Sequence, residues 1–199
     1  MKIKLRDIHP KMIEAWKKFF KDDPDVEISW GDIFGEKANA IVSPANSFGF
    51  MDGGIDAIYS FRWPHIQKEL QDFLLQNCYG ELPVGTAVII STGEKDIPWL
   101  ISAPTMRVPM DVIGTVNAFL AFRAVLIQVK AHNSLNEEKL HINSILCPGL
   151  GTAVGRMPHD ICALQMLFAY KVVMKNTPAI VDDLTEAWNS HYILAKGQA

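Results

Sequence analysis

The sequence predicts an α/β fold, a three-layer α/β/α sandwich around a mixed central sheet. Short apolar runs typical of strands alternate along the chain with longer segments whose apolar residues recur at helical spacing. Two glycine-rich loops, 43–56 and 148–156, directly follow apolar strand-like segments. Ligands of such sheets bind beyond the carboxyl ends of the strands, so the two loops together predict a small-molecule site.

Six segments have the apolar or alternating pattern of strands. They are Lys2–Leu5, Val26–Trp30, Ala38–Val42, Thr86–Ser91, Trp99–Ser102 and Ile142–Cys147. The third and the last are short and largely apolar, as strands buried on both faces of a sheet are. Each of these two runs directly into one of the glycine-rich loops.

Apolar residues at helical spacing predict helices between these strands. The predicted ranges are Pro10–Phe20, about 55–76 with an interruption at Pro64, Thr115–His132, Pro158 to about Val173, and about Val181–Tyr192 in the tail. In the first helix, Met12, Ile13 and Trp16 form an apolar stripe. The predicted core face of the third consists of Val116, Phe119, Leu120, Ala124, Ile127 and Ala131.

The composition indicates a globular protein. With 199 residues, of which 49% are hydrophobic and 21% charged, we expect one domain over residues 1–199. The net charge of −3 disfavours a general electrostatic attraction to nucleic acid. No apolar run approaches the length of a membrane helix, and residues 1–20 lack the continuous apolar segment of a secretory signal. We therefore expect a cytoplasmic protein without a membrane partner.

The spacing of cysteines and histidines indicates neither disulfides nor a metal site. Cys78, Cys147 and Cys162 are odd in number and widely separated, which is typical of reduced thiols. The six histidines form no HxxxH or HExxH pair, and the cysteines form no CxxC pair. We expect no metal and no cofactor, and we expect Cys147 to be a buried strand residue rather than a nucleophile.

The second loop, PGLGTAVGR at 148–156, has the composition of an anion site. Glycines let several backbone N–H groups turn toward one anion, and the helix predicted after Pro158 would add partial positive charge. A tight strand-to-helix turn that needs glycine for geometry alone is the other interpretation. The spacing is neither GxGxxG nor GxxxxGK[ST], so a dinucleotide-type Rossmann domain and a Walker-A nucleotide hydrolase are disfavoured.

The first loop offers side chains that suit a sugar. The amide of Asn46 could bind ribose hydroxyls, although a lone Asn is as often a turn residue bonded to its own backbone. Gly53 and Gly54 allow a ligand to approach the backbone. Asp56 could accept from a hydroxyl or orient a water, or could be an ordinary helix N-terminal acid. Upstream, Asp32 could accept from an exocyclic amine of a base, or could belong to a simple Gly-Asp turn.

Taken together, these segments resemble the macro domain family. The matching motifs are GDI at 31–33, AIVSPANS at 40–47, GGID at 53–56, PVGTAVI at 83–89, APT at 103–105 and PGLGTAVGRMP at 148–158. They occur in the family's order over roughly residues 26–175, between an N-terminal strand and helix and a C-terminal helical extension. The resemblance implies an α/β/α sandwich that binds ADP-ribose or related NAD metabolites. Some members hydrolyse ADP-ribosyl esters or O-acetyl-ADP-ribose, and others only bind.

The resemblance also assigns roles to residues. Asp32 would accept from the adenine amino group, with Ile33 beside the base, and Asn46 would contact the distal ribose. The diphosphate and distal ribose would lie along Gly53, Gly54 and Ile55, and along Gly151, Thr152, Ala153, Val154 and Gly155. Asp56 matches the acid that, in hydrolytic members, helps to position water at the anomeric carbon. A phosphate of the ligand can assist that water, so no protein base of shifted pKa is required.

The chain departs from the family pattern at several positions. Ser43 replaces the first Asn of Asn-Ala-Ala-Asn, and Asp52 and Ala153 replace frequent glycines. No strand pattern follows the 158–173 helix, and we expect the N-terminal strand and helix to compensate. Three hypotheses remain open: an ADP-ribose-binding hydrolase of ADP-ribosyl conjugates or O-acetyl-ADP-ribose, a non-catalytic ADP-ribose reader, and an interaction module. The expected partner is ADP-ribose or an ADP-ribosylated substrate.

Aromatic and basic residues near the loops have two interpretations each. Phe48, Phe50, Tyr59 and Trp63 could cover the ligand, but we expect at least two of them in the core. Single basic residues are more often solvated than bound to a phosphate. The candidates for a supplementary phosphate contact are Arg62, Lys68 and Arg156.

Overall fold

The computed structural model describes residues 1–21, 23–177 and 181–197, and shows a mixed six-stranded sheet. The strands are β1 (Lys2–Asp7), β2 (Val26–Trp30), β3 (Ala40–Ser43), β4 (Val88–Ser91), β5 (Trp99–Ser102) and β6 (Ser144–Cys147). Their order across the sheet is β2-β1-β6-β3-β5-β4. Every neighbouring pair is parallel except β4 with β5. The carboxyl ends of the five parallel strands therefore meet at one edge.

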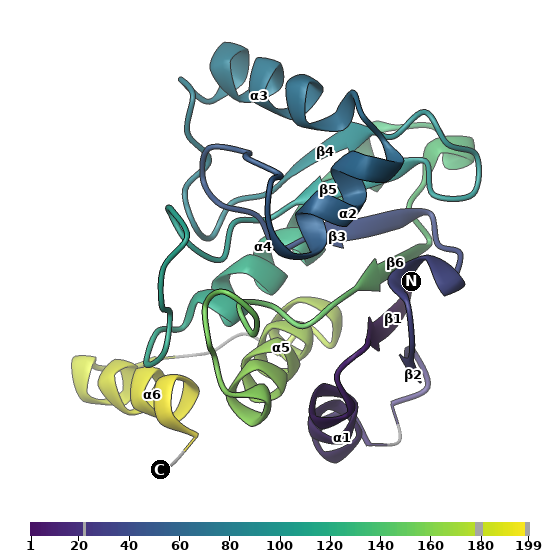
Figure 1. Ribbon diagram of the computed structural model, residues 1–199. Helices are drawn as coiled ribbons and strands as arrows, with labels where there is room; N and C mark the ends of the chain where they lie inside the picture. The colour runs from purple at the N-terminus through teal and green to yellow at the C-terminus, as the bar shows by residue number, and fades with distance from the viewer. Residues whose placement is uncertain (22, 178–180, 198–199) are drawn as a thin grey trace.

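Helices cover both faces of the sheet, which confirms the predicted three-layer sandwich (Figure 1). The α-helices are α1 (Pro10–Phe19), α2 (Gly54–Arg62), α3 (Ile66–Asn77), α4 (Asn117–Leu135), α5 (His159–Met174) and α6 (Leu184–Lys196). Helices α2 and α3 lie on one side, and α1, α4 and α5 lie on the other. Helix α6 packs against α5. Two short 3₁₀ helices, η1 (Ile33–Gly35) and η2 (Glu138–Leu140), lie in connections.

The central strands are buried on both faces because each face has its own apolar core. In β3 all four residues are buried, and successive side chains point to opposite sides. Ala40 and Val42 belong to the core beneath α1, α4 and α5, whereas Ile41 belongs to the core beneath α2 and α3. This burial on both sides explains why the sequence of β3 is almost entirely apolar.

The N-terminal strand fills a central position in the sheet. Strand β1 lies between β2 and β6 and is parallel to both, as expected for a segment that compensates for a missing final strand. Ile3 and Leu5 are fully buried beneath α1 and α5. Trp16 of α1 is fully buried as well, and its Nε1 lies 3.4 Å from the sulfur of Met166 in α5.

Several element boundaries differ from the sequence prediction. The segment predicted as one interrupted helix over 55–76 is two helices, α2 and α3, and they are separated at the predicted break around Pro64. The tail helix runs over Leu184–Lys196 rather than Val181–Tyr192. The predicted core face of the 115–132 helix is only partly right: Ala124 is buried, but Ile127 is 40% exposed and the buried residues include Phe122 and Val125. None of the described helices combines the length and apolar character that a bilayer crossing requires.

Candidate functional site

A cavity of about 370 Å³ opens at the edge where the parallel strands end. Its walls are the segments that follow β1, β2, β3, β5 and β6, together with the start of α2. The two glycine-rich loops thus face one cavity rather than separate parts of the surface. The volume is in the range of small-molecule sites.

The loop after β6 presents a run of backbone donors to this cavity. The N–H of Gly149 donates to Asp7 Oδ2 at 3.0 Å, and the N–H of Leu150 points to Cys162 Sγ at 3.3 Å. Among the described residues, no acceptor is paired with the N–H groups of 151–155, and all five of these residues line the cavity. Five adjacent donors without an internal partner form a cradle suited to an anion.

Two glycines of this loop are required by the fold itself. Gly151 has φ of 71°, and a Cβ there would lie 3.2 Å from Val112. A Cβ at Gly155 would lie 2.6 Å from both the Gly151 carbonyl and Val112. The turn interpretation therefore holds for these two positions, and it coexists with the donor cradle.

The loop before α2 supplies a second set of donors to the same cavity. Gly53 precedes the helix, and among the described residues no acceptor is paired with the N–H groups of 53–55. Gly54 has φ of 57°, a conformation that favours glycine. A Cβ at Gly53 or Gly54 would meet no atom within 4 Å, so open space lies beside both. A helix N-terminus adds partial positive charge at this wall.

Asp32 and Ile33 stand at the far end of the cavity, after β2. Asp32 Oδ1 accepts from the Phe34 N–H at 2.8 Å, which leaves the other carboxylate oxygen of this exposed residue uncommitted. Ile33 is 6% exposed and lines the cavity beside it. A carboxylate next to an apolar wall suits an aromatic ring that carries an amino group.

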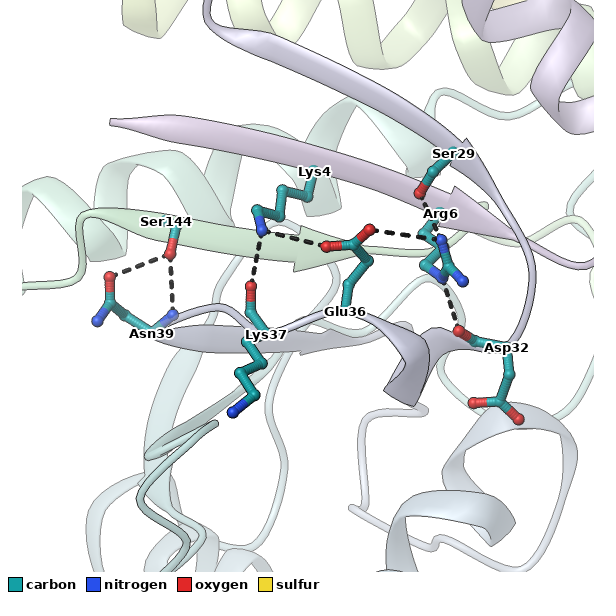
Figure 2. Close-up of polar contacts among 8 residues, drawn as sticks. All are labelled: Lys4, Arg6, Ser29, Asp32, Glu36, Lys37, Asn39 and Ser144. Carbon is teal, nitrogen blue, oxygen red and sulfur yellow. Dashed lines mark hydrogen bonds and ion pairs between the residues drawn. The ribbon is translucent and has the colours of Figure 1, made fainter.

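The loop that contains Asp32 is held by Arg6 of β1 (Figure 2). Arg6 Nε donates to the Asp32 carbonyl at 2.6 Å, and Nη1 donates to Ser29 Oγ at 2.7 Å. A Cβ at Gly31 or Gly35 would lie 2.6 or 2.7 Å from Arg6 Nη2, so the guanidinium packs between two glycine backbones. Figure 2 shows the Asp32 carboxylate pointing away from this guanidinium.

Asp56 is a buried acid at the wall of the cavity. Ser43 Oγ of β3 donates to Asp56 Oδ1 at 2.7 Å, so Ser43 occupies the position of the missing Asn and contacts the loop acid directly. Burial raises the pKa of Asp56 to about 7, although the hydrogen bond from Ser43 lowers it in part. Near neutral pH this carboxyl can therefore either give or take a proton.

The sequence comparisons agree with this geometry. The Macro domain family model matches residues 42–166, which is more than half of the chain and includes both cavity loops. The chain belongs to the macro domain family. An uncharacterized protein of Aquifex aeolicus is 30% identical over 171 residues, covering 82% of this chain and 95% of its own length.

Solved structures of other macro domains have the same fold. The Oceanobacillus iheyensis macrodomain with ADP matches at a TM-score of 0.60 with 22% identity, over 81% of this chain and 84% of that one. A mutant of the same protein with ADPR matches at 0.55 with 26% identity, over 69% and 73%. The α/β/α architecture of this macro domain is thus that of its relatives.

Asn46 of the macro domain is largely committed to its own loop. Asn46 Oδ1 accepts from the N–H groups of Phe48 and Phe50 at 3.1 and 3.3 Å, and Nδ2 donates to the Phe50 carbonyl at 2.7 Å. These bonds are those of the turn alternative. Asn46 still lines the cavity, with one amide hydrogen left for a ligand.

The other candidate residues divide between core and surface. Tyr59 and Trp63 are buried, which confirms that at least two of the four aromatics are core residues, whereas Phe50 is 53% exposed at the cavity. Arg62 forms a two-pronged ion pair with Glu94 at 2.6 and 2.8 Å and does not line the cavity. Lys68 and Arg156 do not line it either.

The thiols behave as the sequence predicts. Cys147 is fully buried at the end of β6, and burial raises its pKa well above the usual range. Burial likewise raises the pKa of Cys162 to about 12. Both thiols therefore remain protonated and unreactive near neutral pH.

Among the described residues, no group of three His, Cys, Asp or Glu side chains could hold a metal ion.

Sequence reasoning missed the cavity residues that follow β1 and β5. Asp7, Ile8 and His9 line the cavity, as do Thr105 and Met106. The short alternating pattern at 2–5 predicts a strand but does not show that this strand enters the sheet beside β6. Since strand order decides which loops meet, the pattern alone could not place Asp7 at the site.

Proposed function

We propose that this macro domain binds ADP-ribose or a closely related NAD-derived nucleotide. The observation on which this proposal rests is that two segments lining one cavity, 53–55 and 151–155, have backbone N–H groups with no acceptor among the described residues. A diphosphate is the anion whose two linked groups suit two facing donor loops. The Oceanobacillus iheyensis macrodomain structures with ADP and with ADPR support the same ligand class.

In this proposal the remaining contacts follow the length of the cavity. Asp32 accepts from the adenine amino group and Ile33 contacts the base. Asn46 and Ile55 lie toward the distal ribose. Acidic residues outnumber basic ones among the lining side chains, so main-chain donors rather than lysine or arginine must neutralise the diphosphate.

Calorimetric titration with ADP-ribose tests the proposal through Gly53→Val. Gly53 has φ of −143°, which a β-branched residue adopts readily, and its Cβ would project into open space. We expect a loss of affinity of at least about 30-fold with no more than about 1 kcal/mol lost in unfolding free energy, the latter from a poorer helix N-cap. Gly151→Val is unsuitable, because its positive φ and contact with Val112 would strain the fold. Unchanged affinity in a folded Gly53→Val variant would contradict the proposal.

Hydrolysis of an ADP-ribosyl conjugate or of O-acetyl-ADP-ribose is the second candidate, and Asp56 favours it. The carboxyl lines the cavity and has a pKa of about 7, so its ionised form can orient a water and accept its proton. The non-catalytic reader remains the alternative, and it is supported by the commitment of Asn46 to its own loop.

Turnover assays separate the hydrolase from the non-catalytic reader. If Asp56 orients water as a carboxylate, activity on O-acetyl-ADP-ribose or mono-ADP-ribosylated protein should rise with pH through about 7 and fall by at least about 100-fold in Asp56→Ala. Asn46→Ala should cause a smaller loss. Wild-type turnover no greater than that of both variants, with ADP-ribose affinity retained, would leave only the reader function.

We also propose a cytoplasmic location for the protein, and the three free cysteines support it.

A further inference from the structure

The order of strands in the sheet also sets the order of the groups that a ligand meets. Strands β2, β1 and β6 are consecutive neighbours, and all three end at the cavity. The loop after β2 carries Asp32, the proposed adenine contact, and the loop after β6 carries the donors of 151–155, the proposed diphosphate contact. The end of β1 lies between them. In an adenosine diphosphate, the group between base and phosphates is the adenosine ribose.

Asp7 is the last residue of β1 and lines the cavity at this intermediate position. Its Oδ1 accepts from the His9 N–H at 2.9 Å, and its Oδ2 accepts from the Gly149 N–H at 3.0 Å. These two bonds hold the carboxylate in place. Each oxygen of an ionised carboxylate can accept a second hydrogen bond, so the group retains capacity for a ligand.

The cation next to Asp7 in the sequence is already engaged. Arg6 donates to the Asp32 carbonyl and to Ser29, and its Nη1 lies 3.7 Å from Glu36 Oε1 (Figure 2). Arg6 and His9 also line the cavity, but the Arg6 guanidinium is held by the Asp32 carbonyl, Ser29 and Glu36, whereas Asp7 and Asp32 each add a carboxylate. The environment therefore offers acceptors for hydroxyl groups and is unfavourable for a second phosphate.

We propose that Asp7 accepts hydrogen bonds from the 2′ and 3′ hydroxyls of the adenosine ribose and thereby excludes ligands that carry a 2′-phosphate. This inference rests on the proposed binding of ADP-ribose. A carboxylate is well matched to a vicinal diol, whereas it repels a phosphate dianion placed on the same oxygen. The site would then take ADP-ribose derived from NAD and reject its counterpart derived from NADP.

Competition titrations with three ligands test the inference. For the wild-type protein, we expect ADP-ribose to bind at least about 30-fold more tightly than 2′-phospho-ADP-ribose. We also expect about a five- to tenfold preference over the analogue whose adenosine ribose lacks the 2′ hydroxyl. Asp7→Asn should reduce the preference over the phosphorylated ligand at least about fivefold, because the carboxylate charge is lost.

The ratio between ligands distinguishes a ribose contact from a purely structural role. Asp7 also holds the Gly149 N–H, so Asp7→Asn could loosen the diphosphate loop, but that would weaken all three ligands equally. Asp52→Asn removes the same charge from the loop before α2, which also lines the cavity, and it should leave both ratios within about twofold. Wild-type binding of ADP-ribose without discrimination, or ratios unchanged in Asp7→Asn, would overturn the inference. Failure of the wild type to bind any of the three would instead contradict the proposed function.

Discussion

At the scale of single residues, Asp56 couples the site to stability. Its carboxyl is 7% exposed and accepts from Ser43 Oγ, and burial raises its pKa from the ordinary 3.8 to about 7. Between these two values the folded state binds a proton that the unfolded state has lost. The contribution of Asp56 to stability is therefore fully present below about pH 4 and is lost as pH rises through about 7.

Asp56→Asn tests this linkage. Because the amide cannot ionise, the variant should gain stability relative to the wild type as pH rises from about 4 to about 8, by on the order of 3–4 kcal/mol. Urea denaturation at a series of pH values measures the difference in unfolding free energy. A difference that stays constant over this range would show that the carboxyl titrates normally.

Residue identity predicted some site features and left others undecided. Asp32, Gly53 and Gly54 line the cavity as their motifs suggest. Asn46 also lines it, but the same side chain closes its own loop, and no pattern in the sequence could exclude that turn. Gly155 illustrates the converse, since close contact with the Gly151 carbonyl and Val112 is by itself enough to require a residue without a Cβ.

At the scale of elements, the segment from Gly31 to Gly35 depends on a side chain from another strand. Arg6 of β1 bonds the Asp32 carbonyl and packs its guanidinium against Gly31 and Gly35. The Gly-Asp turn is therefore positioned by β1, outside the motif that identifies it. This arrangement makes the proposed adenine end of the site sensitive to packing around η1.

Gly35→Ala is a way to disturb that segment without removing a charge. The new Cβ would lie 2.7 Å from Arg6 Nη2, and the flexible guanidinium would have to move. We expect about a three- to tenfold loss of ADP-ribose affinity and less than about 1 kcal/mol lost in unfolding free energy.

Asp32→Ala, which removes the carboxylate acceptor itself, should cost about 1–3 kcal/mol of binding free energy. Calorimetric titration of both variants with ADP-ribose measures the loss of affinity. Full affinity in Gly35→Ala would rule out a positioning role for Arg6.

Helix boundaries were more predictable than helix faces. Pro64 predicts the break that separates α2 from α3. In α4 the apolar residues extend around most of the helix, so several faces fit the sequence equally well. The structure buries Phe122 and Val125 and leaves Ile127 40% exposed, which only the packing of α4 against α5 decides.

At the scale of the whole molecule, the N-terminal strand β1 belongs to the sheet that carries the site, and helix α1 packs against β1 and β2. Strand β2 pairs with β1, and β1 pairs with β6, so the loops that we propose to hold adenine and the diphosphate are connected through β1. Sequence patterns identify strands but not their order, because order depends on long-range pairing. For this reason the layers could be predicted, whereas the place of Asp7 at the cavity could not.

We therefore propose that residues 1–199 fold as one unit, and Trp16→Ala tests it. Trp16 is fully buried between α1 and α5, so its removal should cost about 3–5 kcal/mol in a single unfolding transition. Trp188→Ala, at a side chain that is 53% exposed on α6, is the matched control and should cost less than about 1 kcal/mol. Urea denaturation followed by fluorescence and circular dichroism measures both. Two separate transitions would show that the N-terminal segment folds independently.

A crystal structure with ADP-ribose is the most direct measurement of the central claim that two backbone loops hold a diphosphate. The diphosphate oxygens should lie within hydrogen-bond distance of N–H groups from both 53–55 and 151–155, with adenine at Asp32 and the adenosine ribose at Asp7. ADP-ribose bound outside this cavity, or bound in it with the diphosphate contacting neither loop, would contradict the account.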